Sequence, residues 1–308
     1  MDGVPLVFVE SVVQNSDIDT SEELKQLSSA WGRVGEVQTK NNGELYLSFA
    51  PDSGDWRLHY RMEDFDHIES RTLSREVVRE MSKSITTIRF LPSYSVDEEW
   101  HSVRPDDVNL LQLLTILDAP VKELDIDMAT DYLGPSLYIK LRSKYLNLFK
   151  SFTYLRLTRF KDTRLMEDTI LAPRVRSVYI EPGFKDYGPI SFWVDFFFSE
   201  KCMRLEIDDI DVAAALIEHW KKIDPRTLKY SKVFYAESCP SEALKDIKMR
   251  EINLEAKAPL LEKVKKKVGS RNYIKSFHCI DHPVDPSSKI YVLVYRDIPH
   301  DDLALLFD

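Results

Sequence analysis

Seven short segments with the character of buried strands recur along most of this chain, and they constrain its fold more than any other feature. Most have an apolar residue at each end and a polar residue between, which is typical of a short strand. The segments are residues 88–90, 124–126, 155–157, 178–180, 205–207, 233–235 and 252–254. Helical patterns lie between most of them, at residues 108–117, 137–149, 192–198 and 212–220. Alternating strands and helices predict an α/β protein.

Two architectures fit this alternation. Many strand–helix units, each with too little core to stand alone, suggest a solenoid. The strand cores resemble leucine-rich repeats, although the asparagine or cysteine that normally follows the strand is mostly absent. The same alternation is compatible with one doubly wound domain. No glycine-rich phosphate-binding turn follows any of the strands, so we favour an irregular leucine-rich-repeat-like array over a compact sandwich.

Two pairs of longer strand-like runs predict β-hairpins. The runs at residues 44–49 and 56–61 alternate with period two and flank a turn-rich segment. The runs at 273–280 and 289–296 are joined through Pro283 and Pro286. A solenoid must hide its open end, so we expect the second pair to cap the array as a C-terminal hairpin.

The first residues predict a small helical module. Pro5 suits the first turn of a helix, and an apolar stripe follows it up to Val13. A second helix is expected from Ser21 onward, with its apolar face at residues 24, 27, 31 and 34. Two short helices bury little surface alone and need a third element or a partner. We therefore predict a helical module at 1–42 and an α/β repeat-like interaction domain at 43–308.

Composition narrows the possible partners. The chain has 308 residues and a net charge of −9, which repels nucleic acid at long range. The lysines between Lys263 and Lys267 alternate with apolar residues at helical spacing and fit the solvated face of a helix, so no nucleic-acid partner is expected. Three widely spaced cysteines are typical of a reducing compartment, and no apolar run has the length of a membrane span. We expect a cytoplasmic or nuclear protein without a membrane partner.

No motif in the chain predicts catalysis. His278, Cys279 and His282 offer three metal ligands at most, and neighbouring strand residues point to opposite faces, so neither a metal nor a cofactor is expected. The acidic residues Asp208, Asp209 and Asp211 precede a helix and are explained by capping. A nucleophile with an oriented base and an oxyanion donor is not evident. We predict that the protein is not an enzyme, with an enzyme of unrecognised class as the weakest alternative.

The N-terminal pattern resembles an F-box, the helical module that joins a protein to a cullin-type ubiquitin ligase through a Skp-family adaptor. An F-box begins with Leu-Pro and an apolar helix, and later carries Leu-x-x-Val-Ser/Cys-x-x-Trp. Here Val4 stands for the leading leucine, and Leu27 stands where valine is usual. The resemblance is to nematode-type F-box proteins and covers about the first forty residues. The positions that match the pattern are Pro5, Phe8, Val12, Leu24, Leu27, Ser28 and Trp31.

This resemblance implies a substrate-recognition adaptor of a ubiquitin ligase. The seven matching residues would bind the Skp-family adaptor, and the repeat array would bind a protein substrate. The alternative is a non-catalytic interaction scaffold with a vestigial F-box, in which the N-terminal helices only cap the array.

Overall fold

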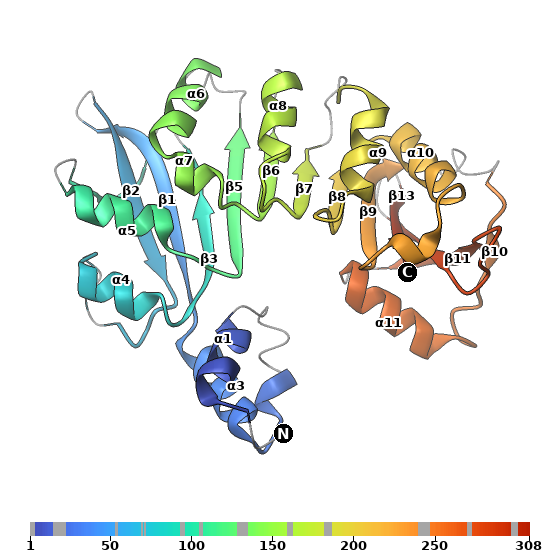
Figure 1. Ribbon diagram of the computed structural model, residues 1–308, viewed down its shortest axis with the longest axis horizontal. Helices are drawn as coiled ribbons and strands as arrows, with labels where there is room; N and C mark the ends of the chain where they lie inside the picture. The colour runs from blue at the N-terminus through green and yellow to red at the C-terminus, as the bar shows by residue number, and fades with distance from the viewer. Residues whose placement is uncertain are drawn as a thin grey trace. The chain divides into compact units, whose positions relative to one another are not determined.

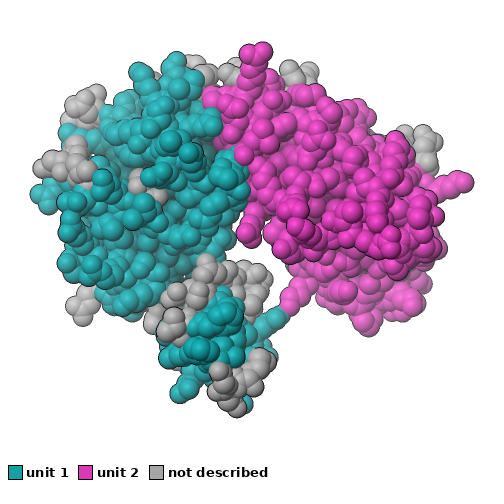
Figure 2. Space-filling view, viewed as in Figure 1, with its two compact units in different colours: residues 1–160, 172–174 teal, residues 161–171, 175–308 magenta. Residues whose placement is uncertain are grey.

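The computed structural model describes residues 4–14, 23–52, 55–68, 70, 72–92, 96–104, 107–127, 135–158, 163–181, 187–239, 247–269, 273–296 and 301–308. The chain forms two compact units (Figure 2). Unit 1 contains residues 1–160 and 172–174, and unit 2 contains residues 161–171 and 175–308. Residue 42, the predicted domain boundary, lies between a helix and the first strand of unit 1.

Unit 1 contains a mixed sheet with the strand order β6-β5-β3-β1-β2-β4. The four strands β1, β3, β5 and β6 are parallel to one another. β2 pairs antiparallel with β1, and β4 pairs antiparallel with β2. The strands are β1 (Gly43–Asp52), β2 (Asp55–Glu63), β3 (Ile85–Phe90), β4 (His101–Ser102), β5 (Val121–Asp127) and β6 (Tyr154–Thr158).

One layer of helices covers this sheet (Figure 1). The parallel strands follow one another across the sheet in chain order, so right-handed crossovers place every connecting helix on the same face. Consistent with this, α5 contacts both α4 and α7, and α6 contacts α7. The helices are α4 (Arg75–Met81), α5 (Val108–Ile116), α6 (Pro135–Lys144) and α7 (Leu146–Phe149); α1 (Leu6–Gln14) and α3 (Ala30–Asn41) precede the sheet.

The two faces of the unit 1 sheet differ in polarity. Along β5, Lys122, Leu124 and Ile126 are buried, whereas Glu123 and Asp125 between them are only half-buried. On the covered face, Phe90 of β3 packs against Phe149 and Phe152, with ring centroids 5.8 and 6.2 Å apart. A sheet buried on one face and solvated on the other shows this alternation, whereas the strands of a doubly wound sheet are apolar throughout.

The strands of unit 2 are hydrogen-bonded in the order β7-β8-β9-β13-β12-β11-β10. Strands β7, β8 and β9 are parallel, and the remaining neighbours are antiparallel. The strands are β7 (Ser177–Ile180), β8 (Arg204–Ile207), β9 (Lys232–Cys239), β10 (Arg250–Glu251), β11 (Ile274–Asp281), β12 (Lys289–Arg296) and β13 (Asp301–Phe307). The last strand of the chain therefore lies inside the sheet.

Helices cover both faces around the central strand of unit 2. Phe307 of β13 packs against Phe197 of α9 and Trp220 of α10, with ring centroids 5.0 and 6.3 Å apart. The neighbouring residue Leu306 points to the other face and belongs to the cluster built by α11 with Val264. Both faces of β13 are therefore buried. The helices of this unit are α8 (Thr163–Ile170), α9 (Ile190–Phe198), α10 (Ile210–Trp220) and α11 (Ala258–Val268), with a 3₁₀ turn η1 (Pro225–Thr227).

The comparison with the sequence predictions is mixed. The α/β class is confirmed, and six of the seven strand cores lie in β3, β5, β6, β7, β8 and β9. The segment 252–254 is not a strand: β10 ends at Glu251, and Ile252 makes one further backbone hydrogen bond, to the carbonyl oxygen of Phe277. Both hairpins form, and the second lies near one end of the strand order, where only the two-residue β10 is outside it. The C-terminal strand β13 lies further in, between β12 and β9. A leucine-rich-repeat arrangement of the whole chain is not confirmed.

Among the residues that the structure describes, each unit buries one lysine at the start of a strand, close to the end of a helix. Lys122 of β5 donates a hydrogen bond from Nζ to the carbonyl oxygen of Leu117, which caps α5, at 2.5 Å. Lys232 of β9 donates to the carbonyl oxygen of Ser199, which caps α9, at 2.8 Å. Helix C-termini leave carbonyls without intrahelical partners and favour cations, so both lysines complete a helix end.

Burial of Lys122 predicts a specific pH dependence of stability. Desolvation lowers the pKa of its ammonium group to about 8, from 10.5 for an ordinary lysine. Between these values the unfolded chain binds more protons than the folded chain, so stability rises with pH. We expect the free energy of unfolding of the wild type to rise by about 2 kcal/mol relative to Lys122→Met between pH 7 and pH 10.

Chemical denaturation at several pH values measures this difference. Lys140→Met, which removes an exposed lysine of α6, is the matched control and should follow the wild type. A difference between wild type and Lys122→Met that stays constant with pH would contradict the burial argument.

Candidate interaction surfaces

The N-terminal helices α1 and α3 pack against each other and form a small core. Val9 and Val13 are fully buried. Phe8 of α1 contacts Trp31 of α3 edge to face, with ring centroids 6.4 Å apart. Only Asn42 separates α3 from β1, so the helix pair is joined to the sheet by a very short connection.

Several apolar side chains of this helix pair remain at the surface. The exposed fractions are 53% for Leu6, 55% for Phe8 and 42% for Leu27. Four of the seven residues that match the F-box pattern are exposed: Pro5, Phe8, Leu27 and Ser28. The other three, Val12, Leu24 and Trp31, are half-buried. Some residues of the F-box-like pattern are therefore accessible to a partner, whereas the half-buried ones pack within the helix pair.

The expected second helix is interrupted, which corrects the prediction that one helix carries residues 24 to 34. Residues 23–25 are helical, residues 26–29 form a turn and bend, and α3 begins at Ala30. Gly32 explains the break, because a Cβ there would lie 1.7 Å from the carbonyl oxygen of Leu27. The backbones approach closely only because residue 32 has no side chain. The predicted start at Ser21 lies outside the described residues.

A row of polar side chains crosses the open face of the unit 1 sheet. The strand register aligns Arg61 of β2 with Tyr46 of β1, Tyr46 with Arg89 of β3, and Arg89 with Glu123 of β5. The guanidinium carbons of Arg61 and Arg89 lie 4.9 and 5.5 Å from the centroid of the Tyr46 ring. Cations at these distances are attracted by the ring face, so the tyrosine links the two arginines.

Two carboxylates, those of Glu44 and Glu123, belong to this row and are paired with Arg89. Arg89 forms ion pairs with Glu44 and Glu123, both at 3.4 Å. Burial raises the pKa of the Glu123 carboxyl, although Arg89 opposes the shift. Burial, together with the hydrogen bond that the Tyr46 hydroxyl donates to Glu44, raises the pKa of Tyr46. No sequence motif marks these residues, although the alternation of apolar and polar residues in β1 and β5 is the signal that places them on one face.

The residues considered as metal ligands serve other purposes. His278 lies 2.9 Å from the hydroxyl of Ser276, and Cys279 is buried in the cluster beneath α11. Within the described part of the chain, no group of three or more histidine, cysteine, aspartate or glutamate side chains is arranged to hold a metal ion. The expected capping is present: Asp209 accepts hydrogen bonds from the backbone N–H groups of Asp211 and Val212 at the start of α10.

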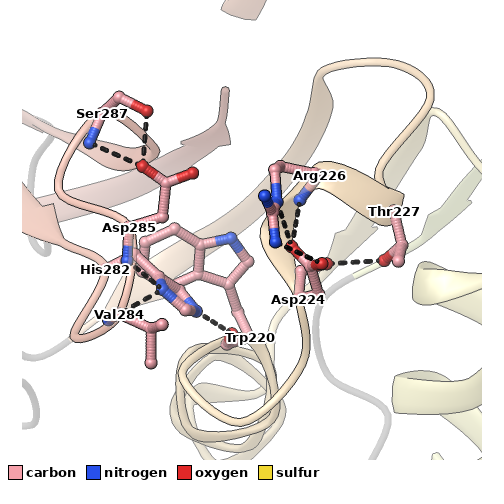
Figure 3. A network of polar contacts seen from close by, with 8 residues as sticks. All are labelled: Trp220, Asp224, Arg226, Thr227, His282, Val284, Asp285 and Ser287. Carbon is pink, nitrogen blue, oxygen red and sulfur yellow. Dashed lines mark hydrogen bonds and ion pairs between the residues drawn. The ribbon is translucent and has the colours of Figure 1, made fainter.

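His282 locks a loop onto the end of α10 (Figure 3). Its Nε2 lies 3.0 Å from the carbonyl oxygen of Trp220, and its Nδ1 accepts hydrogen bonds from the backbone N–H groups of Val284 and Asp285 at 3.2 Å. These contacts require the neutral tautomer with its proton on Nε2. The imidazole also meets the Trp220 indole edge to face, with ring centroids 4.6 Å apart. This buried histidine is structural.

Comparison with known proteins assigns no family, because no protein-family model and no curated protein matches the chain. Among the helices of the described residues, none combines the length and the apolar character needed to cross a membrane.

Replacement of His282 is expected to weaken unit 2. His282→Phe keeps an aromatic ring against Trp220 but removes three hydrogen bonds. It leaves two partly buried N–H groups and the buried carbonyl of Trp220 without this partner. We expect the free energy of unfolding to fall by about 2–3 kcal/mol, measured by chemical denaturation. His278→Phe, which loses one contact at a half-buried position, is the control and should cost clearly less. Equal losses in the two variants would refute the structural role of His282.

Proposed function

We propose that this protein is a substrate-recognition adaptor of a cullin-type ubiquitin ligase, in which the N-terminal helix pair binds a Skp-family adaptor and the α/β region binds a protein substrate. The observation that carries the proposal is the exposure of Leu6, Phe8 and Leu27 on a module that contains the F-box-like pattern. Exposed apolar side chains on a small helical module gain free energy when a partner covers them.

Under this proposal the chain positions a protein substrate close to a separate enzyme and carries out no chemical step itself. The short connection between α3 and β1 limits the motion of a bound adaptor relative to the sheet of unit 1. Holding a substrate near a separate transferring enzyme raises the effective concentration of the reacting groups.

The second candidate function is a non-catalytic interaction scaffold with a vestigial F-box. The half-burial of Val12, Leu24 and Trp31 favours it, because these pattern residues help to build the module itself. In this case the helix pair serves as a terminal cap and needs no adaptor.

Adaptor binding is tested by replacing surface positions of the pattern. We expect Phe8→Asp and Leu27→Asp each to reduce the affinity for a Skp-family adaptor by at least about tenfold, because a charge would be buried in the contact. Affinity can be measured by calorimetry after co-purification of the wild-type pair.

Val37→Asp is the matched control. Val37 is 58% exposed on α3 but lies outside the F-box-like pattern, and its position on the helix is turned well away from that of Trp31. This variant should bind as the wild type does. No binding by the folded wild type would reject the adaptor role and leave the scaffold.

A further inference from the structure

A surface pocket of about 520 Å³ lies between α4 and α5 in unit 1. Its lining comes from one side of each helix. On α5, the residues at 109, 112, 113 and 116 have the spacing of a single helical stripe.

The pocket offers an apolar surface for an anchoring side chain. Val78 and Leu117 are almost fully buried beneath it, with exposed fractions of 3% and 6%. Ile116, which also lines the pocket, is 64% exposed. The opposite side of α5 already contributes Leu110 and Leu114 to the core. The pocket side of α5 thus adds two apolar residues, Leu113 and Ile116, that are not fully buried within the described part of the chain.

Two arginines place positive charge at this apolar surface. Arg75 and Arg79 are four residues apart on α4 and both line the pocket, whereas Glu76 and Glu80 on the same helix do not. Within the described residues, neither guanidinium group has a hydrogen bond or an ion pair. Positive charge is thus segregated to the pocket side of the helix.

The acidic residue of the lining does not cancel this charge. Asp118 is paired with Arg174, whose Nη1 lies 3.0 and 3.2 Å from the two carboxylate oxygens. The two arginines of α4 therefore remain available to an incoming anion. A guanidinium group binds carboxylates with a defined planar geometry.

We infer that this pocket binds an acidic peptide segment of a partner protein, with an apolar side chain seated against Leu113 and Ile116 and carboxylates paired with Arg75 and Arg79. Charge complementarity selects the acidic residues, and the apolar lining selects the anchor. The Asn109 side chain offers both a donor and an acceptor to a peptide backbone. A small-molecule site encloses most of its ligand, whereas the exposure of Ile116 at this pocket fits a partner with a larger surface.

The net charge of −9 makes the positive charge of Arg75 and Arg79 at the pocket a stronger indication of an acidic partner. The chain as a whole repels acidic segments at long range, so recognition of one requires positive charge at the contact itself. That the partner is a ubiquitylation substrate depends on the proposed function, but the binding of the segment does not.

Peptide binding by the purified full chain tests the inference. An array of short fluorescent peptides, in which one leucine or phenylalanine is flanked by glutamates, is compared with the same peptides carrying glutamine. We expect the wild type to prefer the glutamate peptides, and Arg75→Gln/Arg79→Gln to lower the affinity for the best peptide by at least about tenfold. Thermal unfolding of the variant shows whether it remains folded.

Lys140→Gln/Lys150→Gln is the matched control, because it removes the same charge from exposed positions of unit 1 outside the pocket. This lysine variant should bind the peptides as the wild type does. Phe8→Asp should also bind them normally, because it alters only the proposed adaptor contact; peptide binding can therefore be judged separately from adaptor binding. Equal affinity for glutamate and glutamine peptides, or equal loss in the arginine and lysine variants, would overturn the inference. Complete displacement of weakly bound peptides by inorganic phosphate would also overturn it, in favour of a site for small anions.

Discussion

The parallel strands of unit 1 lie side by side in chain order, and this constraint decides how the rest of the unit is built. Right-handed crossovers then place all connecting helices on one face of the sheet. The covered face becomes apolar, and the other face carries the row of Arg61, Tyr46, Arg89 and Glu123. Unit 1 thus presents two chemically different surfaces, a helix layer with an apolar, arginine-edged pocket and a sheet face of paired charges. A sheet with helices on both faces would have neither surface in this form.

The polar row is largely satisfied within the chain, and this separates it from the pocket as a candidate binding site. Glu44 and Glu123 pair with Arg89, and Tyr46 lies against two guanidinium groups. A partner there would have to replace contacts that already exist, at a cost in free energy. Arg75 and Arg79 make no comparable contacts within the described residues. A new partner therefore gains more at the pocket.

Unit 2 depends on its last strand. β13 pairs with β9 on one side and β12 on the other, and it presents Phe307 and Leu306 to opposite helix layers. The sheet and both helix layers therefore meet at β13. Buried Lys232 joins β9 to the end of α9 in this unit, as Lys122 joins β5 to the end of α5 in unit 1. Both lysines stabilise a strand–helix junction that the apolar pattern alone would leave with unpaired carbonyls.

The repeated strands could be predicted from the amino-acid pattern alone, because the alternation of apolar residues at 88–90, 124–126 and 155–157 is a local signal. The sequence also identified the amphipathic N-terminal helices, whose pattern residues Phe8 and Trp31 do meet. The tertiary structure decided the rest. The insertion of β13 between β9 and β12, the break before α3 at Gly32 and the pocket between α4 and α5 depend on contacts between residues distant in sequence or on close backbone approach. Spacing along a chain reports which face a residue occupies, and only packing decides what that face meets.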